Sequence, residues 1–125
     1  MTVGQYLADT HILLWSISDD RRLSEQHRAI LASDVVVFAS AASVCEIAIK
    51  RSIGKLDAPD DLPTLLPRMR FQPLAVTLHH ANTVSGLPHH HGDPFDRLLI
   101  AQAQVENLTI LTSAPHFARY GVALA

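Results

Sequence analysis

The sequence predicts an α/β fold in which helices cover both faces of a central sheet, and three observations point to it. The chain has 125 residues, close to the commonest size of a domain, so positions 1–125 are expected to form one unit. Its composition, 48% hydrophobic and 18% charged, is that of a folded protein with a buried core. Short apolar runs alternate with segments of helical periodicity, which is typical of a mostly parallel sheet, here of four to five strands.

Five short apolar runs are the expected strands. They are Tyr6-Leu7-Ala8, Val35-Val36-Val37-Phe38, Pro73-Leu74-Ala75-Val76, Leu108-Thr109-Ile110-Leu111-Thr112 and Val122-Ala123-Leu124. The second run is β-branched without interruption, which predicts burial on both faces, and the last is short enough to be an edge strand. Ligands of parallel sheets bind beyond the carboxyl ends of the strands. Asp9 follows the first run and Thr112-Ser113-Ala114 closes the fourth, so both are expected at that edge.

Helices are expected between these runs, and capping residues mark several of their starts. Ser24 is the expected N-cap of one helix, and Ser40 or Ser43 caps the helix that Gly54 ends. Asp93 is the expected N-cap of the last helix, with proline in its first turn. Further helical segments begin at residue 12 and span 60–70 and 78–84, while 88–92 is loop. The expected inner sides are Ala29, Ile30 and Leu31; Val44, Ile47 and Ala48; and Leu98, Leu99, Ile100, Ala101, Ala103 and Val105.

Four acidic residues are candidates for a chemical site, and each also has an ordinary structural role. Asp9 lies between apolar runs, where a carboxylate needs a partner or a metal; capping the next helix is the alternative. Glu46 stands among apolar residues; an ion pair with Lys50 is the alternative, and it would turn Glu46 outward. Asp93 and Asp96 share a helix face, where N-capping and the helix dipole alone would explain both.

Gathered in one cleft, these carboxylates would repel one another unless a cation lay between them. Two unit charges about 4 Å apart cost roughly 4 kcal/mol at an effective dielectric of about 20. A divalent ion removes that cost, and an all-oxygen ligand set favours Mg²⁺ or Mn²⁺ over zinc. Such an ion can also activate a water molecule toward a phosphodiester. We therefore expect Asp9, Glu46 and Asp96 to hold a metal, with Asp93 as a further ligand.

Histidines and basic residues near the acids give weaker signals. The tract His89-His90-His91 lies in a loop without the helical spacing of zinc hydrolases, so it is not expected to bind a native metal. His11 is the histidine expected nearest the acids, although packing at the helix start explains it equally well. The basic residues nearest the acids in sequence either attract the phosphates of a phosphodiester substrate or form a solvated helix face. They are Lys50, Arg51 and Arg97.

The sequence also indicates the compartment. A single cysteine, Cys45, excludes an internal disulfide and fits a reducing environment, and its apolar neighbours predict a buried side chain. No run approaches the roughly 20 apolar residues of a membrane span, and the N-terminus lacks the character of a signal peptide. We expect a cytoplasmic protein without membrane contact. A net charge of -2 gives the whole chain no basic face.

Three stretches of the sequence form a familiar pattern: 7–15, 43–50 and above all 87–103, which contains Asp93-Pro94-Phe95-Asp96-Arg97. They resemble the PIN-domain family, and more narrowly the VapC toxins of type II toxin–antitoxin pairs. The resemblance implies a doubly wound PIN-like α/β/α sandwich and a ribonuclease dependent on Mg²⁺ or Mn²⁺. It assigns the acids to Asp9, Glu46 and Asp96, with Asp93 as an additional acid of the subgroup. It also implies a small antitoxin partner that occludes the pocket, and a homodimer.

One position departs from the family pattern. The fourth strand of such proteins usually ends in Thr-x-Asp, whereas this chain has Thr112-Ser113-Ala114. Thr10 or Ser113 would supply the small hydroxyl that orients a ligand. The alanine leaves three readings open: activity with the remaining acids, reduced activity, or a deliberate change that disarms the protein. A non-catalytic scaffold that binds RNA or antitoxin is therefore the alternative function. A phosphatase with Asp9 as nucleophile fits less well, because His11 stands where a second acid is usual.

Overall fold

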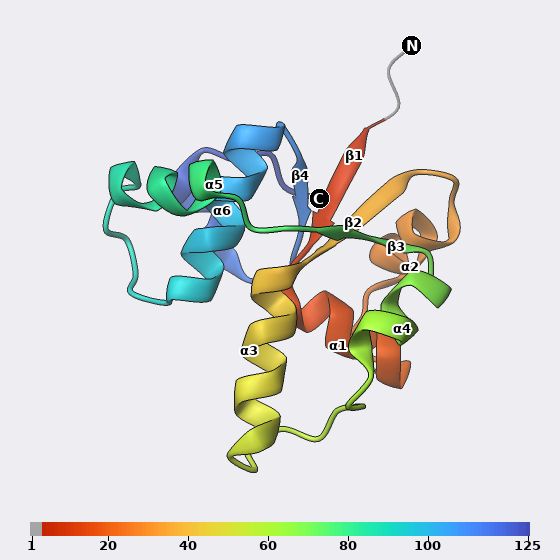
Figure 1. The fold of residues 1–125 in the computed structure, drawn as a ribbon. Coiled ribbons are helices and arrows are strands. Elements are labelled where there is room, and N and C mark those ends of the chain that lie inside the picture. The colour runs from red at the N-terminus through yellow and green to blue at the C-terminus, as the bar shows by residue number, and fades with distance from the viewer. Residues whose placement is uncertain (1–3) are drawn as a thin grey trace.

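A four-stranded parallel sheet forms the middle layer of the computed structural model, which describes residues 4–125 (Figure 1). The strands are β1 Gln5–Ala8, β2 Val36–Ser40, β3 Phe71–Leu74 and β4 Thr109–Leu111. Their order is β3-β2-β1-β4, and every pairing is parallel. The predicted α/β class and sheet are confirmed, and the carboxyl ends of all four strands meet at one edge.

Helices cover both faces of the sheet. They are α1 Thr10–Ser18, α2 Glu25–Ala32, α3 Ala41–Ser52, α4 Leu62–Arg68, α5 Leu78–Thr83 and α6 Pro94–Glu106, with short 3₁₀ turns η1 Val84–Gly86 and η2 Pro115–Tyr120. In Figure 1, α5 and α6 lie on one side of the strands, and α1, α2 and α4 lie on the other. Within residues 4–125, none of the helices combines the length and the apolar character that crossing a membrane requires.

Alternate residues of the strands belong to two separate cores. Leu7 and Ile110 pack into a cluster with the apolar side of α6, while Ala8 and Leu111 pack into a second cluster with α1 and α4. This is the period of two that a strand imposes, with both faces buried. The sheet is therefore held from both sides, and the residues that follow its strands have fixed positions.

The predicted N-caps are present, and the predicted inner side of α2 is confirmed for Ile30 and Leu31, which pack against the core, but not for Ala29. Ser24 accepts a hydrogen bond from the amide of His27, and Ser40, rather than Ser43, caps α3. His27 is the buried residue of α2, whereas Ala29 is exposed. The reason is tertiary: the His27 ring hydrogen-bonds to the carbonyl of Ala125 over 2.9 Å, which turns that face of the helix inward.

Two predicted strands and one predicted side-chain position differ in the structure. β3 begins at Phe71, two residues before the predicted start, and Pro73 is tolerated because β3 is an edge strand. The run 122–124 forms only an isolated bridge, from Leu124 to Ile110, and no strand. Cys45 is exposed, because α3 turns Ala42, Glu46 and Ile47 inward instead.

Candidate functional site

Asp9 lies directly after β1 and is only 2% exposed. Its Oδ1 accepts a hydrogen bond of 2.8 Å from the amide of Ile12, so Asp9 is the N-cap of α1. Its Oδ2 accepts a hydrogen bond from the hydroxyl of Thr112, which follows β4. Burial raises the pKa of Asp9, and the bonds from Thr112 and Ile12 oppose that rise. Each oxygen keeps a second lone pair, so capping leaves the carboxylate able to bind a cation.

Thr10 joins the start of α1 to α3. Its hydroxyl donates a buried hydrogen bond of 3.0 Å to Oγ of Ser43. Ser43 lies three residues before Glu46, on the same face of α3. The bond therefore holds the Glu46 face of α3 against the segment that begins with Asp9.

Glu46 is 5% exposed, although it forms the ion pair that was expected to turn it outward. Lys50 Nζ lies 2.8 Å from Oε2 of Glu46, one turn along the helix. The expectation was wrong because the half-exposed Lys50 side chain reaches back from the solvent side and covers the carboxylate. The other oxygen, Oε1, is buried and has no hydrogen-bond partner among the described residues. This oxygen is an unused acceptor in the interior.

Asp96 stands in the first turn of α6 and is largely buried. Its Oδ2 lies 2.9 Å from Nε2 of His116. Burial raises the pKa of Asp96, the negative charges of Asp93 and Glu46 raise it further, and His116 opposes them. The positive charge of Lys50 in turn has Glu46, Asp93 and Asp96 as its electrostatic partners, which raise its pKa. Three of the four candidate acids thus lie within electrostatic range of one another.

Asp93 has the predicted structural role. Its Oδ1 accepts hydrogen bonds from the amides of Phe95 and Asp96, over 2.9 and 3.0 Å. This N-cap fixes the first turn of α6, and with it the position of Asp96.

The segment that follows β4 connects Asp9 to Asp96. A cavity of about 210 Å³ opens beside Asp9, and its lining includes Ser113 and Ala114. His116, the hydrogen-bond partner of Asp96, is two residues after Ala114. The Cα atoms of Ala114 and His116 therefore lie within about 7 Å of each other. Asp9 and Asp96 therefore flank one short segment of chain, and Ala114 faces the cavity where the family pattern has an acid.

His11 also lines this cavity, and its ring lies 5.7 Å from that of Trp15. Its predicted location near the acids and its packing at the helix start are therefore both present. Ser113 is exposed at the cavity, whereas the hydroxyl of Thr10 is committed to Ser43. Of the two predicted hydroxyl residues, Ser113 is the one placed to reach a ligand.

The chemical type of the acidic residues suits a divalent cation. Asp9 and Glu46 are buried carboxylates, and burying such a charge is costly unless a cation compensates it. Glu46 Oε1 has no partner among residues 4–125, and Lys50 pairs with the other oxygen of the same carboxylate. Carboxylate oxygens are ligands that Mg²⁺ and Mn²⁺ prefer. Asp9, Glu46 and Asp96 offer donor atoms suited to such an ion, with Asp93 beside Asp96, but within residues 4–125 their carboxylates do not form a group with ligand atoms within 4.8 Å of one another.

The three basic residues differ in what they can contact. Lys50 is half-exposed and pairs with the carboxylate of Glu46. Arg51 donates a hydrogen bond of 2.7 Å to the carbonyl of Pro59. Arg97 is 7% exposed, and its guanidinium donates to several backbone carbonyls and to the hydroxyl of Tyr120. These carbonyls belong to Val84, Leu87 and Pro88. The prediction that Arg97 contacts RNA therefore disagrees with the structure, because its donors already hold the loop before α6.

Sequence reasoning missed three side chains of this region. Thr112 was noted at a strand end, but not as the partner of Asp9. His116 forms a hydrogen bond with Asp96 although 20 positions separate them in the sequence. The hydroxyl of Tyr120 forms a hydrogen bond with His91 across 29 positions. No local pattern links such distant positions, although His116 follows a strand end where function was expected.

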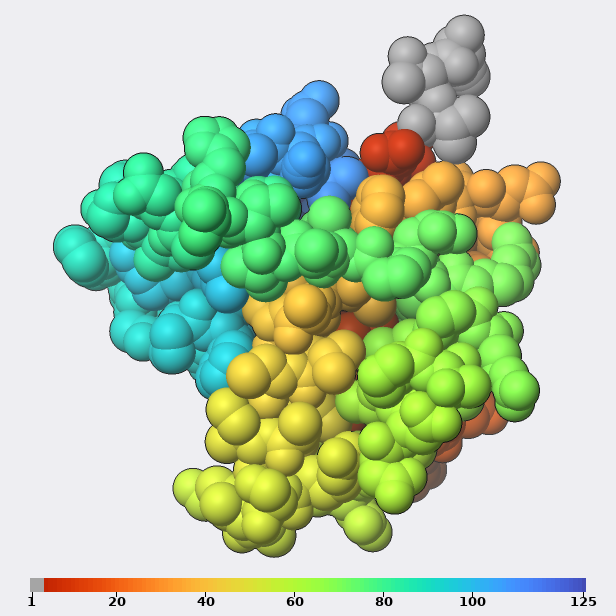
Figure 2. Space-filling view, viewed as in Figure 1, coloured from red at the N-terminus to blue at the C-terminus, as the bar shows by residue number. Residues whose placement is uncertain are grey.

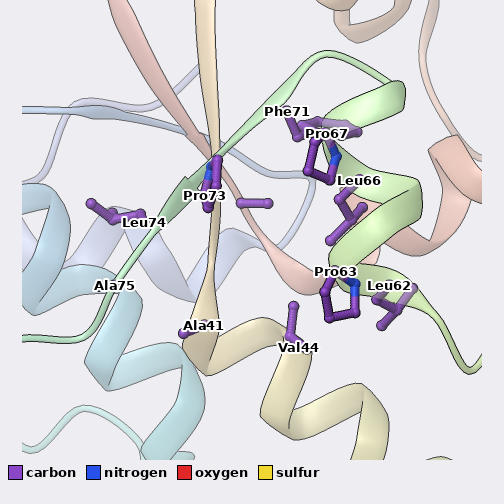
Figure 3. Close-up of a pocket in the computed structure, with 11 residues that line it drawn as sticks. Ala41, Val44, Leu62, Pro63, Leu66, Pro67, Phe71, Pro73, Leu74 and Ala75 are labelled. Atoms are coloured by element: carbon purple, nitrogen blue, oxygen red, sulfur yellow. The ribbon is translucent and has the colours of Figure 1, made fainter.

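A second, larger cavity is apolar. It has a volume of about 420 Å³ and lies among α4, β3 and the start of α3 (Figure 3). Figure 2 shows the molecular face between α3 and α4 hollowed in this region. Its lining holds alanine, valine, leucine, proline and phenylalanine and no titratable side chain, so it cannot supply acid–base or metal chemistry.

Comparisons with known proteins agree with this architecture. The PIN domain family matches residues 6–123, while a comparison with curated proteins gave no match. VapBC2 from Rickettsia felis, bound to a DNA fragment from its promoter, is similar with a TM-score of 0.72, 17% identity and 97% of each chain covered. DNA-bound VapBC from Salmonella typhimurium gives 0.70, 16% identity and 98% of each chain. FitAcB from Neisseria gonorrhoeae gives 0.67, 20% identity and 95% of each chain. Because the family matches almost the whole length and the fold recurs in these structures, the chain belongs to the PIN domain family.

Proposed function

We propose that the protein is the toxin of a toxin–antitoxin pair, an endoribonuclease that depends on Mg²⁺ or Mn²⁺. The observation that carries the proposal is the unpartnered, buried Oε1 of Glu46, within electrostatic range of Asp96 and at the end of the sheet where Asp9 is buried. Similar folds in complexes described as VapBC and FitAcB support the toxin role.

Some residues of the chain would bind the ion, and others hold those ligands in position. Asp9, Glu46 and Asp96 are the residues that would hold the divalent ion, which would supply Lewis acidity toward the phosphodiester and lower the pKa of a water molecule. Asp93 fixes Asp96 through the N-cap of α6, and Thr112 fixes Asp9. These contacts preorganise the carboxylates, so little reorganisation is needed when a phosphate arrives.

Lys50 and Arg51 are the basic residues proposed to meet RNA phosphates. Both lie in the last turn of α3, and Lys50 pairs with Glu46 on the side of the acids. Their positive charges would attract the sugar–phosphate backbone without reading its sequence. Arg97 is left out of this surface because it is buried.

The proposed partner is a small antitoxin protein, and the proposed setting is a cytoplasmic homodimer. The apolar cavity at α4 and β3 is the surface suited to an apolar segment of that partner. Ala41 is exposed at the rim of this cavity. Ala41→Asp should therefore weaken antitoxin binding and leave cleavage unchanged; unweakened binding would exclude this cavity.

A second candidate function is favoured by one specific observation. Ala114 lines the cavity beside Asp9, where the family pattern has an acid that alanine cannot replace. The protein would then be a catalytically weakened PIN scaffold that binds RNA or antitoxin. Retained RNA binding without cleavage at millimolar Mn²⁺ identifies this case.

The deciding experiment compares Glu46→Gln with Glu25→Gln on a structured RNA, with Mn²⁺ and with chelator. Glu46→Gln keeps the size of the side chain and removes its charge, so cleavage should fall by about a hundredfold or more. Glu25 lies in the first turn of α2 and is exposed, so its variant should cleave like the parent. Asp96→Asn should also abolish cleavage without unfolding the protein. Equal rates for the parent and the Glu46 variant would refute the proposed site.

A further inference from the structure

Three side chains from three separate segments meet at the amino end of α6. His91 comes from the loop before α6, Asp96 from its first turn and His116 from η2. One ligand atom of each lies within 4.8 Å of the others. Nε2 of His116 is 2.9 Å from Oδ2 of Asp96, and Nε2 of His91 is 3.7 Å from the same oxygen. The two imidazole rings lie side by side, with centroids 4.4 Å apart.

The ring nitrogens of His91 have very different surroundings. Nδ1 lies 2.6 Å from the hydroxyl of Tyr120, whereas Nε2 is buried and has no hydrogen-bond partner among residues 4–125. Metal-binding histidines normally have this arrangement: an outer partner holds one nitrogen and sets the ring, and the other faces the metal. Tyr120 is itself buried and receives a hydrogen bond from Arg97, so the outer partner is fixed.

We propose that His91, Asp96 and His116 form a binding site for a transition-metal ion of the zinc class. Two imidazole nitrogens and one carboxylate oxygen favour Zn²⁺, Co²⁺ or Ni²⁺ over Mg²⁺, which prefers oxygen ligands alone. Metal–ligand bonds of about 2.0 to 2.2 Å place ligand atoms about 3 to 3.5 Å apart, so the observed separations close with small side-chain movements. Three protein ligands leave a further coordination position open.

This site goes beyond the proposed all-oxygen site, although the two share Asp96. The imidazoles lie outside the acid set, and His116 is two residues after Ala114, the position that lacks the fourth acid. The sequence predicted that the tract His89-His90-His91 does not bind a metal. The proposed site reverses that prediction for His91, the member of the tract that belongs to the cluster. The competing explanation is a plain hydrogen-bonded pair of His116 and Asp96 with no metal.

The test uses the full chain without a purification tag, stripped with a chelator and then titrated with Zn²⁺ by calorimetry and with Co²⁺ by visible absorption. One ion should bind per chain, and the Co²⁺ spectrum should show the intense d–d bands of a low-coordinate nitrogen-containing site. His91→Ala and His116→Ala should each weaken binding by about tenfold or more. His89→Ala is the matched control, because His89 belongs to the same tract, is exposed and lies outside the cluster.

A further variant tests Tyr120, the residue that positions the ring of His91. Tyr120→Phe keeps the buried ring but removes the hydroxyl that holds Nδ1 of His91, so Zn²⁺ binding should weaken by about tenfold while circular dichroism stays unchanged. Absence of one-to-one binding would overturn the proposal, and so would an equal loss in His89→Ala and His91→Ala. Zn²⁺ binding is measured without RNA, so its failure and the failure of the nuclease proposal are separate results.

Discussion

The hydroxyl of Thr112 donates a hydrogen bond to Oδ2 of Asp9, and the two residues follow neighbouring parallel strands, β4 and β1. The same oxygen of Thr112 accepts a hydrogen bond of 2.9 Å from the amide of Ala114. One side chain therefore fixes both the carboxylate of Asp9 and the segment that leads to His116. The position of Asp9 relative to His116, the partner of Asp96, therefore depends on Thr112.

Asp9→Asn should stabilise the metal-free protein at neutral pH. Burial raises the folded-state pKa of Asp9 above 3.8, so the charged form carries an energetic cost at pH values above that raised pKa. Below 3.8 the carboxyl is protonated in both the folded and the unfolded state, and the cost vanishes. Asparagine removes the charge and remains a good N-cap.

Urea unfolding in chelator across the acid-to-neutral range measures this effect. The stability advantage of Asp9→Asn should grow as the pH rises from 3.8 through the raised pKa, and then stay constant. Asp57→Asn, at an exposed loop position, is the control for loss of an acid. A variant less stable than the parent at neutral pH would contradict the prediction.

Ala114→Asp should increase metal-dependent RNA cleavage by about tenfold or more, because an added carboxylate at the Asp9 cavity strengthens the hold on a divalent ion. Cleavage rates over a Mn²⁺ titration give the measurement. Ala118→Asp adds the same charge four residues later, at an exposed position outside the cavity lining, and should give a smaller gain. Identical Mn²⁺ dependence in Ala114→Asp and the parent would show that the alanine does not limit activity.

Arg97→Lys should lower the free energy of unfolding by about 2 to 4 kcal/mol, because lysine cannot replace a planar guanidinium that donates to several carbonyls. Chemical denaturation measures the change. Arg119→Lys, an exposed change of the same type, should alter the free energy by less than about 0.5 kcal/mol. If both variants lose equally little, the buried guanidinium is not what holds the loop before α6.

Lys50→Gln should weaken RNA binding and reduce its dependence on salt. Loss of one phosphate contact lowers the slope of log affinity against log salt by about 0.7 for single-stranded RNA. Fluorescence anisotropy at several salt concentrations measures both quantities. Arg68→Gln, an exposed change in α4, is the matched control and should keep the parent slope. An unchanged slope for Lys50→Gln would remove this residue from the RNA-binding surface.

Local sequence signals predicted most of the fold because helix caps and apolar runs act over a few residues. Ser24 and Asp93 could be identified as caps for that reason, and the run after Val35 could be identified as a strand. The start of β3 could not, because it is set by pairing with β2 rather than by its own residues. The same holds for His27, whose burial depends on the carbonyl of Ala125 at the other end of the chain.

The candidate site was predictable in part for the same reason. Helical spacing identified the contact between Glu46 and Lys50 only as the alternative to burial of Glu46, whereas the pair and the burial occur together. The hydrogen-bond partner of Asp96 could not be predicted from the sequence, because the position of His116 depends on how the segment after β4 packs. Local sequence patterns therefore identified the acids as candidates, and only the fold identified their neighbours.

The separation of Asp9 and Thr112 also bears on how the protein is made. These two residues are 103 positions apart, and β1 cannot pair with β4 before Thr109–Leu111 has been added to the chain. Domains fold as units during synthesis, from the amino-terminal side. A nascent chain that ends before β4 therefore has an unpaired edge on β1 and an Asp9 that lacks Thr112. Unfinished copies of the protein lack the assembled site, so whatever it does begins only once translation has passed the last strand.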